Sequence, residues 1–438
     1  MGAQSLAVAC GVLALCLTLA EATNPGFVVR ITEAGFNMEL RNFYLANSRI
    51  SLVPSMGPQL SISNAFADVN GNWQAKKKIK IHGSFHVKLQ DVNIKVNLKL
   101  GNDASGKPTI DTSSCTIYIS KVRAKLSGKL SKIYNLFHKV IESKLKKFLE
   151  KKTCDIVAKS VRSDLQPYVQ TLPVTAKIDA IAGVDYSLVG PPMATTQSLD
   201  VPMKGECYSL AQRSAVPFSP PALTLPPDHD RMVYFGVSSY FFNTASFAYH
   251  KSGALVFEIT DSMIPKTVEF HLKTTTFSAF IPQLEEKYPD KEMKLKVSAP
   301  SAPFLNIGPG GLSLQPVVDV EAYAIVPDSS PAPLFLLSLT GNVSAVISVK
   351  SGHIIGNLTM DGMKLSLKRS DVGDFQVETL QPTMNIFASN ILVPHINDRL
   401  GQGFPLPLLD RMQLSDIIVQ FHQNLLLLGA NVQYQPWV

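Results

Sequence analysis

The sequence lacks the short motifs of the common catalytic and cofactor sites. It has no G-x-S-x-G elbow, no H-E-x-x-H zinc helix and no P-loop, and the proline within Gly308–Gly311 is incompatible with a dinucleotide fingerprint. The Asp-His-Asp cluster at 228–230 adjoins a proline-rich stretch and is interpreted as a solvated turn. His82 and His86 share a strand face with no cysteine or carboxylate beside them, so no metal site is predicted. We therefore expect neither an enzyme nor a cofactor-dependent protein.

Long apolar segments are also scarce. An apolar run from Leu6 to Ala20 leads into Ala20-Glu21-Ala22, which is typical of a secretory signal cleaved after Ala22, although its first residues carry no positive charge. No later run approaches the ~18 apolar residues that a membrane-spanning helix needs. We expect a secreted protein, and storage in cytoplasmic granules is the alternative to direct secretion.

Cysteine is rare, and two of the five cysteines lie in the predicted signal. The other three, Cys115, Cys154 and Cys207, permit three pairings. We predict the Cys115–Cys154 disulfide, because it brackets a compact unit and would remove ~4 kcal/mol of chain entropy from the unfolded state. Cys207 is then a thiol that is either buried and inert or reactive.

Charged residues make up only 17% of the 438 residues, whereas 45% are hydrophobic, which is enough for two or three domains. The charge is uneven: residues 23–215 hold 27 basic and 14 acidic residues, and residues from 216 onward hold 14 and 19. A basic half in an exported protein favours anionic partners such as lipid headgroups, lipopolysaccharide, glycosaminoglycans or nucleic acid. Ala215–Asp230 has five prolines in sixteen residues and is predicted to be a stiff linker.

Both halves have the alternating pattern of antiparallel strands. Asn70-Gly71 predicts a hairpin turn, and from Ile79 to Leu89 apolar residues alternate with lysine, histidine and serine. On pattern alone, the lysines are best interpreted as a solvated or edge-protecting strand face. In the second half, VEFHL, MKLKV, VDVEAYAIV, VSAVISV and MKLSLK alternate with period two, and Ser351-Gly352 and Asp361-Gly362 are predicted turns.

Residues 131–155 have the clearest helical pattern, with lysines on the face opposite the apolar positions. Such a helix could lie on an anionic membrane. Packing against a sheet, with the lysines in solvent and the helix ending at Cys154, is the favoured interpretation. The apolar positions are Ile133, Leu136, Phe137, Val140, Ile141, Leu145, Phe148 and Leu149.

The two halves share a faint internal repeat. LQPYVQTLPVTAKIDAIAGVDYSLVG follows the predicted helix, and INDRLGQGFPLPLLDRMQLSDIIVQFHQNLLLLGANV stands near the C-terminus. Each runs from a helix end through a proline step into two apolar strands, which predicts a duplicated domain.

Several segments also resemble a known family. NPGFVVRITEAG, VNGNWQAKKKIKI, SGKPTIDTSSC, LFHKVIESKLKKFLEKKTCD, HDRMVYFGVSSYFFNTA and GFPLPLLDRMQL are similar to the family of bactericidal permeability-increasing, lipopolysaccharide-binding and lipid-transfer proteins. The resemblance implies an α+β boomerang of two similar elongated antiparallel β-barrels, each wrapped around a long helix and holding a phospholipid in an apolar pocket. A central sheet joins the barrels. The expected domains are a signal peptide at 1–22, a basic N-terminal barrel at 23–215, a linker at 216–230 and a C-terminal lipid-binding barrel at 231–438.

The chain departs from the family after Ile31–Gly35. The family continues there into a long amphipathic helix and the first barrel strands, whereas this sequence passes to FNMELRNFYLANSRISLVPSMG. We therefore expect an incomplete N-terminal barrel whose sheet loses a packing partner and exposes apolar surface.

The resemblance implies a function as well. Asn72–Lys80 matches a lipopolysaccharide-binding strand at the cationic tip of the N-terminal barrel. The candidate contacts to lipid A are Trp73, Lys76, Lys77, Lys78, Lys80 and Lys88. We expect a monomeric innate-immunity protein that binds lipopolysaccharide, the outer membrane of Gram-negative bacteria and phospholipid, with antibacterial and endotoxin-neutralising action and no nucleic-acid partner. The alternative is a carrier that transfers lipid or lipopolysaccharide between membranes and acceptors.

Two sequons lie in the second half. They are Asn342-Val-Ser344 and Asn357-Leu-Thr359, and the strand phase of the flanking apolar residues turns both asparagines outward on one hairpin. We predict that at least one of them is glycosylated.

Overall fold

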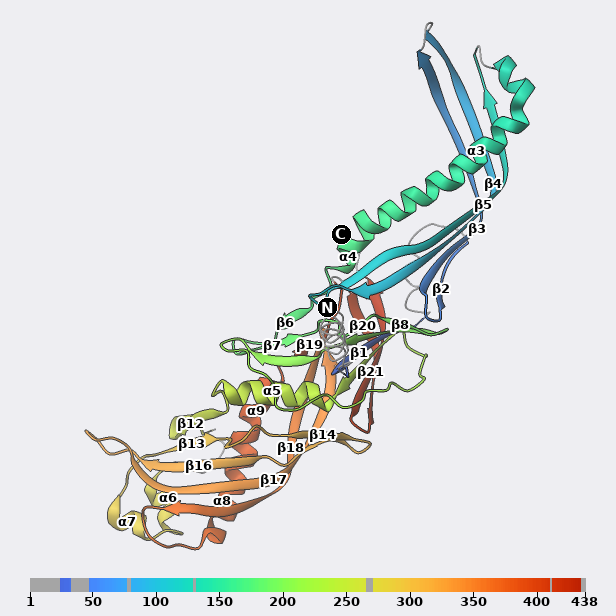
Figure 1. Ribbon diagram of the computed structural model, residues 1–438. Coiled ribbons are helices and arrows are strands. Elements are labelled where there is room, and N and C mark those ends of the chain that lie inside the picture. The colour runs from blue at the N-terminus through green and yellow to red at the C-terminus, as the bar shows by residue number, and fades with distance from the viewer. Residues whose placement is uncertain are drawn as a thin grey trace, which may run out of the picture.

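The computed structural model describes residues 24–32, 47–76, 80–128, 131–264, 271–409 and 412–434, so the predicted signal at 1–22 lies outside the described residues. The molecule is elongated, with one sheet at each end and a third between them (Figure 1). Within the described ranges, every helix is too short or too polar to cross a bilayer.

The N-terminal sheet has four antiparallel strands in the order β2-β3-β4-β5. A long helix, α3, lies along the edge strand β5 (Figure 1). The bounds are β2 (Ser48–Val53), β3 (Gly57–Lys76), β4 (Lys80–Asn102), β5 (Pro108–Leu126), α3 (Ser131–Ser160), η1 (Val161–Leu165) and α4 (Gln166–Val169). The helix was predicted to end at Cys154, but it continues to Ser160 and on through η1 into α4.

Asn70-Gly71 does not form the predicted turn. Both residues lie inside β3, where Asn70 pairs with His86 and Gly71 with Phe85. A Cβ at Gly71 would lie 2.5 Å from Cζ of Phe85, so the glycine admits the aromatic ring across the strand pair. The hairpin instead closes between Lys76 and Lys80, which pair with each other.

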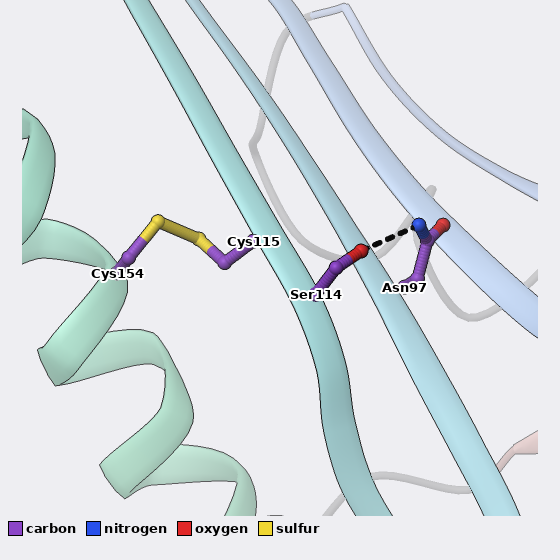
Figure 2. Close-up of a disulfide and its surroundings, with 4 residues drawn as sticks. All are labelled: Asn97, Ser114, Cys115 and Cys154. Carbon is purple, nitrogen blue, oxygen red and sulfur yellow. Dashed lines mark hydrogen bonds between the residues drawn. A yellow bond between two sulfur atoms is a disulfide. The ribbon is translucent and has the colours of Figure 1, made fainter.

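Polar side chains of the helices cover the unpaired N–H groups of edge strand β5. Carboxylate Oε1 of Glu150 accepts from the N–H of Ile119 at 3.2 Å, and Gln166 Oε1 accepts from that of Ile110 at 2.5 Å. The Cys115–Cys154 disulfide joins the same strand to α3, which confirms the predicted pairing (Figure 2). The helix thus protects the edge of the sheet from pairing with another chain.

The central sheet combines strands from both ends of the chain. Its order is β20-β21-β11-β1-β9-β8, and a three-stranded sheet, β10-β7-β6, lies beside it. Arg30 on β1 forms a bidentate ion pair with Asp200 on β9, at 2.7 and 2.8 Å. The bounds are β1 (Phe27–Thr32), β6 (Thr175–Lys177), β7 (Ala182–Asp185), β8 (Met193–Ala194), β9 (Ser198–Met203), β10 (Glu206–Ser209), β11 (Val233–Ser238), β20 (Met412–His422) and β21 (Leu425–Tyr434).

The proline-rich segment contains no helix or strand, as a linker predicts. It does not stand free of the sheet, because the side chain of Leu225 is buried against the central strands and the Pro226 carbonyl accepts a hydrogen bond from Arg30. Cys207 is a free, buried thiol in the adjoining core, and burial raises its pKa. That environment matches the inert alternative.

The C-terminal sheet has eight strands, and α8, η4 and α9 pack against its inner face (Figure 1). Its strands are β12 (Val256–Thr260), β13 (Met293–Ser298), β14 (Leu305–Gly308), β15 (Gly311–Leu314), β16 (Val317–Ala324), β17 (Ala332–Lys350), β18 (His353–Ser370) and β19 (Phe404–Pro405). The helices are α5 (Ser239–Lys251), η2 (Asp261–Met263), α6 (Thr274–Ser278), α7 (Gln283–Lys287), η3 (Val377–Leu380), α8 (Gln381–Phe387), η4 (Ala388–Leu392) and α9 (Val393–Leu400).

Most strands predicted for this half are confirmed, with two corrections. Ser351-Gly352 forms the predicted turn with both φ angles positive, but Asp361-Gly362 lies within β18, opposite a register shift in β17. A Cβ atom at Gly341 would lie 2.6 Å from the carbonyl oxygen of Gly362. The absence of a side chain at Gly341 therefore allows the two strands to approach closely at this bulge. Of VEFHL, residues 268–270 lie outside the described residues, and His271 and Leu272 are not in a strand.

Candidate functional site

The end of the β3–β4 hairpin projects beyond the rest of the N-terminal sheet (Figure 1). The last residue of β5 that pairs with β4 is Leu126, opposite Phe85, and just beyond it Ser127 exchanges hydrogen bonds with Ser84. Nearer the tip, β3 and β4 pair with each other alone among the described residues. Lys76 pairs with Lys80 and Trp73 with Gly83 in this two-stranded ribbon. The fold therefore brings Trp73, Lys76 and Lys80 together on the ribbon's backbone. The side chains of these three residues lie outside the described part of the structure, as do Lys77 and Lys78 altogether.

Lys88 lies further from the tip and has an acidic partner. Its Nζ is 3.1 Å from Oδ2 of Asp68 on β3, and His86 also contacts this carboxylate. Hydrogen bonds from Lys88 and His86 lower the pKa of Asp68. His86 therefore does have a carboxylate beside it, contrary to the sequence interpretation, because the strand pairing brings Asp68 from a distant position. No group of three or more potential metal-ligating side chains occurs among the described residues.

Strand β5 adds three cations that the sequence interpretation missed. Lys121, Arg123 and Lys125 are exposed and alternate with the buried Val122 and Ala124. The alternation in the letters KVRAK was the available signal, but the sequence does not say which strand lies beside it.

The strand register places these cations next to those of β4. Arg123 lies directly opposite Lys88, and Lys125 lies opposite His86. Like charges in directly opposed positions repel each other and destabilise a sheet. An anionic partner bound to this surface would offset that repulsion. We call Lys88, Lys121, Arg123 and Lys125, together with Lys76 and Lys80 of the ribbon, the cationic face.

Helix α3 covers the opposite face of the sheet only in part. Leu145 and Leu149 pack on Val92, Ile119 and Val122, which form a small core. Leu136, Phe137, Val140 and Phe148 are 51–76% exposed, so half of the predicted packing positions do not pack. This contradicts the predicted packing of the whole apolar stripe and agrees with the expected loss of a packing partner.

An exposed aromatic residue accompanies the cationic face. Phe66 on β3 is 84% exposed and stands two residues before Asp68 on the same strand. An isolated exposed phenylalanine is unremarkable in a soluble protein. Because Phe66 is close in sequence to Asp68, the partner of Lys88, it adds an apolar group to this part of the sheet. Cationic and apolar groups together suit a ligand that carries both anionic groups and acyl chains.

Comparisons with known proteins agree with this architecture. The N-terminal domain of the LBP / BPI / CETP family matches residues 14–168, and its C-terminal domain matches residues 176–434. Human lipopolysaccharide-binding protein is 44% identical, over 97% of this chain and 90% of that protein. Rat bactericidal permeability-increasing protein is 38% identical, over 94% of this chain and 95% of its own. Human phospholipid transfer protein is 23% identical, over 91% of this chain and 80% of that protein.

A solved structure shows the same fold. The crystal structure of a lipopolysaccharide binding protein superimposes with a TM-score of 0.59 at 38% identity, covering 94% of this chain and all of that one. The α+β fold with two sheet-and-helix halves and a central sheet, expected from the resemblance, is thereby confirmed. The chain belongs to the LBP / BPI / CETP family.

Proposed function

We propose that this protein binds lipopolysaccharide through the cationic face of its N-terminal sheet. The observation that carries the proposal is the register of β4 and β5, which places Lys88 opposite Arg123. The same strand β4 leads to the hairpin end, where Lys76 pairs with Lys80. The relatives named for lipopolysaccharide binding support the choice of ligand. The lipid A phosphates would contact the ammonium groups, and the exposed ring of Phe66 would contact the acyl chains.

The test replaces Lys76 and Lys80 of the ribbon, together with Lys77 and Lys78 between them in the sequence, with alanine. A lysine near an anionic lipid surface contributes ~1 kcal/mol, so we expect lipopolysaccharide affinity to fall by up to ~10³-fold in titrations with purified lipopolysaccharide. The salt dependence of binding should flatten, because exposed charges are screened over ~8 Å at physiological ionic strength. An unchanged affinity and salt slope would rule out the ribbon as the binding site.

A matched pair of double variants tests the rest of the face. Lys121→Ala with Lys125→Ala removes two charges from β5, whereas Lys350→Ala with Lys364→Ala removes two exposed charges from the C-terminal sheet. Only the first pair should weaken binding. We expect Lys88→Ala alone to have a smaller effect, because Asp68 already partly neutralises this lysine.

The second candidate function is transfer of lipid or lipopolysaccharide between membranes. The exposed apolar side chains of α3 favour it, because they offer an unenclosed surface to acyl chains. The human phospholipid transfer protein among the relatives supports it as well. Mass spectrometry of lipids extracted from the purified protein, together with transfer of a fluorescent phospholipid between vesicles, distinguishes the candidates, because a protein that only binds would hold lipid without moving it.

We infer that the chain acts outside the cell as a binding protein with antibacterial action, and not as an enzyme. The predicted signal at its N-terminus and the Cys115–Cys154 disulfide support export. The relatives are named for the lipids that they bind or transfer, or for an effect on bacteria. Killing and endotoxin-neutralisation assays with the wild-type protein and the ribbon variant would show whether the antibacterial action follows lipopolysaccharide binding.

A further inference from the structure

A cleft of about 440 Å³ opens on the outer surface of the C-terminal sheet, far from the cationic face. The strand register sets its floor. Asn306 pairs with Ser313, Ser313 with Ser344, and Ser344 with Thr359, so one polar row crosses β14, β15, β17 and β18. All of these strands present this row on the same face, because cross-strand pairs share a face.

A second polar group lies beside this row. Gln315 directly follows β15, and Asn342 and Asp361 stand two residues from Ser344 and Thr359 on β17 and β18. Gln315 donates from Nε2 to Oδ1 of Asn342 at 2.9 Å. Asp361 belongs to the same group, and its Oδ2 accepts from the hydroxyl of Ser344 at 3.1 Å. The cleft is therefore lined by amides, hydroxyls and one carboxylate. No lysine or arginine lines it among the described residues, so it is not suited to phosphate.

Phe304 forms the apolar wall of the cleft. The residue is 55% exposed, and its ring packs edge-to-face against Phe218 of the linker, with ring centroids 6.0 Å apart. An aromatic ring beside a set of amides, hydroxyls and a carboxylate matches the two surfaces of a sugar. The C–H groups of a sugar ring lie on an aromatic face, and its hydroxyl and acetamido groups exchange hydrogen bonds.

Asn342, the acceptor of the first sequon, lies in this cleft. Its Oδ1 is held by Gln315, and no hydrogen bond from its Nδ2 is present within the described structure. Ser344, the sequon hydroxyl residue, lines the same cleft. The other sequon acceptor, Asn357, is exposed opposite Val346 and is not part of the cleft.

We propose that this cleft is a hexosamine-binding site occupied by the chain's own N-linked glycan at Asn342. Covalent attachment gives the first sugars a high effective concentration, so weak stacking on Phe304 and hydrogen bonds to Asn306 and Asp361 suffice to hold them. Attachment replaces one Nδ2–H of Asn342. The Nδ2–C1 bond forms on an oligosaccharide supplied as a lipid diphosphate, the C1–O bond to the diphosphate breaks, and the displaced proton leaves to the transferring enzyme's base. The glycan at Asn342 is held on the protein surface, whereas any glycan at Asn357 extends into solvent.

The experiment uses the full chain secreted from mammalian cells. Glycopeptide mass spectrometry follows the rate at which an amidase that cleaves N-glycans releases sugar from each asparagine of the folded protein. We expect slower release at Asn342 than at Asn357, and Phe304→Ala should raise the Asn342 rate about three- to tenfold, the size of one aromatic contact. Ile386→Ala, an exposed apolar change on α8, should leave the rate unchanged.

A second variant covers the case in which Phe304→Ala disturbs folding. Asn306→Ala removes only an exposed amide and should also raise the Asn342 rate. If Asn342 is glycosylated but neither variant changes its rate, the glycan does not occupy the cleft and the proposal fails. If Asn342 carries no glycan and the Asn342→Gln protein binds free chitobiose, a disaccharide of the same hexosamine, the cleft takes a sugar from another molecule. The assignment of the cleft to the chain's own glycan is then wrong as well. Lipopolysaccharide affinity should be unaffected in all of these variants.

Discussion

Removing the Cys115–Cys154 disulfide should selectively destabilise the N-terminal sheet. The two cysteines are 39 residues apart, and a loop of this length corresponds to ~4 kcal/mol of unfolded-state chain entropy. Apolar packing of α3 is thin, because several of its apolar residues are exposed and, among the described residues, Leu145 and Leu149 alone join its small core; the other contacts to β5 are polar, such as the hydrogen bond from Ile119 to Glu150. We therefore expect the double serine variant to lose ~4 kcal/mol in the free energy of unfolding of this sheet, a large share of a domain's typical stability.

Tryptophan fluorescence in urea provides the measurement. The chain has two tryptophans, Trp73 on β3 and Trp437 near the C-terminus, so Trp437→Phe leaves a single reporter in the N-terminal sheet. Cys207→Ala in both the test and reference proteins prevents exchange with the remaining thiol. A loss below about 1 kcal/mol, or an equal loss in hydrogen-exchange protection of the central sheet, would show that the loop-closure argument does not apply here.

Two further predictions concern the β3–β4 hairpin. Gly71→Ala should destabilise it by ~1–3 kcal/mol, because the new Cβ would meet the ring of Phe85. Adding Phe85→Ala should recover part of the loss, and strictly additive losses in a double-mutant cycle would contradict the contact. Acid should weaken the strand pairing around Asp68, because folding lowers the pKa of this carboxyl group below its ordinary 3.8. The ionised carboxylate then stabilises the folded state at pH values above 3.8, and this stabilisation is lost as the pH falls through the lower pKa of the folded state. Asp68→Asn should abolish this pH dependence in amide-exchange measurements of His86 and Lys88, and an unchanged acid response would contradict it.

The sequence by itself determined the local structure of the chain. Period-two alternation defined the strands around Val343–Val349 and Met293–Val297, and helical spacing defined α3, because each pattern reflects the geometry of one element. The outward direction of Asn342 and Asn357 followed from the same alternation. Three cysteines outside the predicted signal permitted three pairings, and the Cys115–Cys154 pair was predicted because it brackets a compact unit.

Only the tertiary structure decided which elements meet. Asn70-Gly71 has the composition of a turn, but in the fold Gly71 leaves room for the ring of Phe85 on the neighbouring strand. The residues around Gly71 in the sequence do not indicate that this ring lies there. The exposure of Leu136 and Phe148 depends on which elements are available to cover α3, and not on the spacing within the helix. The alignment of Lys88 with Arg123 depends on strand register, which brings together residues far apart in sequence. Local geometry depends on neighbouring residues in the sequence, whereas a surface made of several strands forms only after those strands have paired.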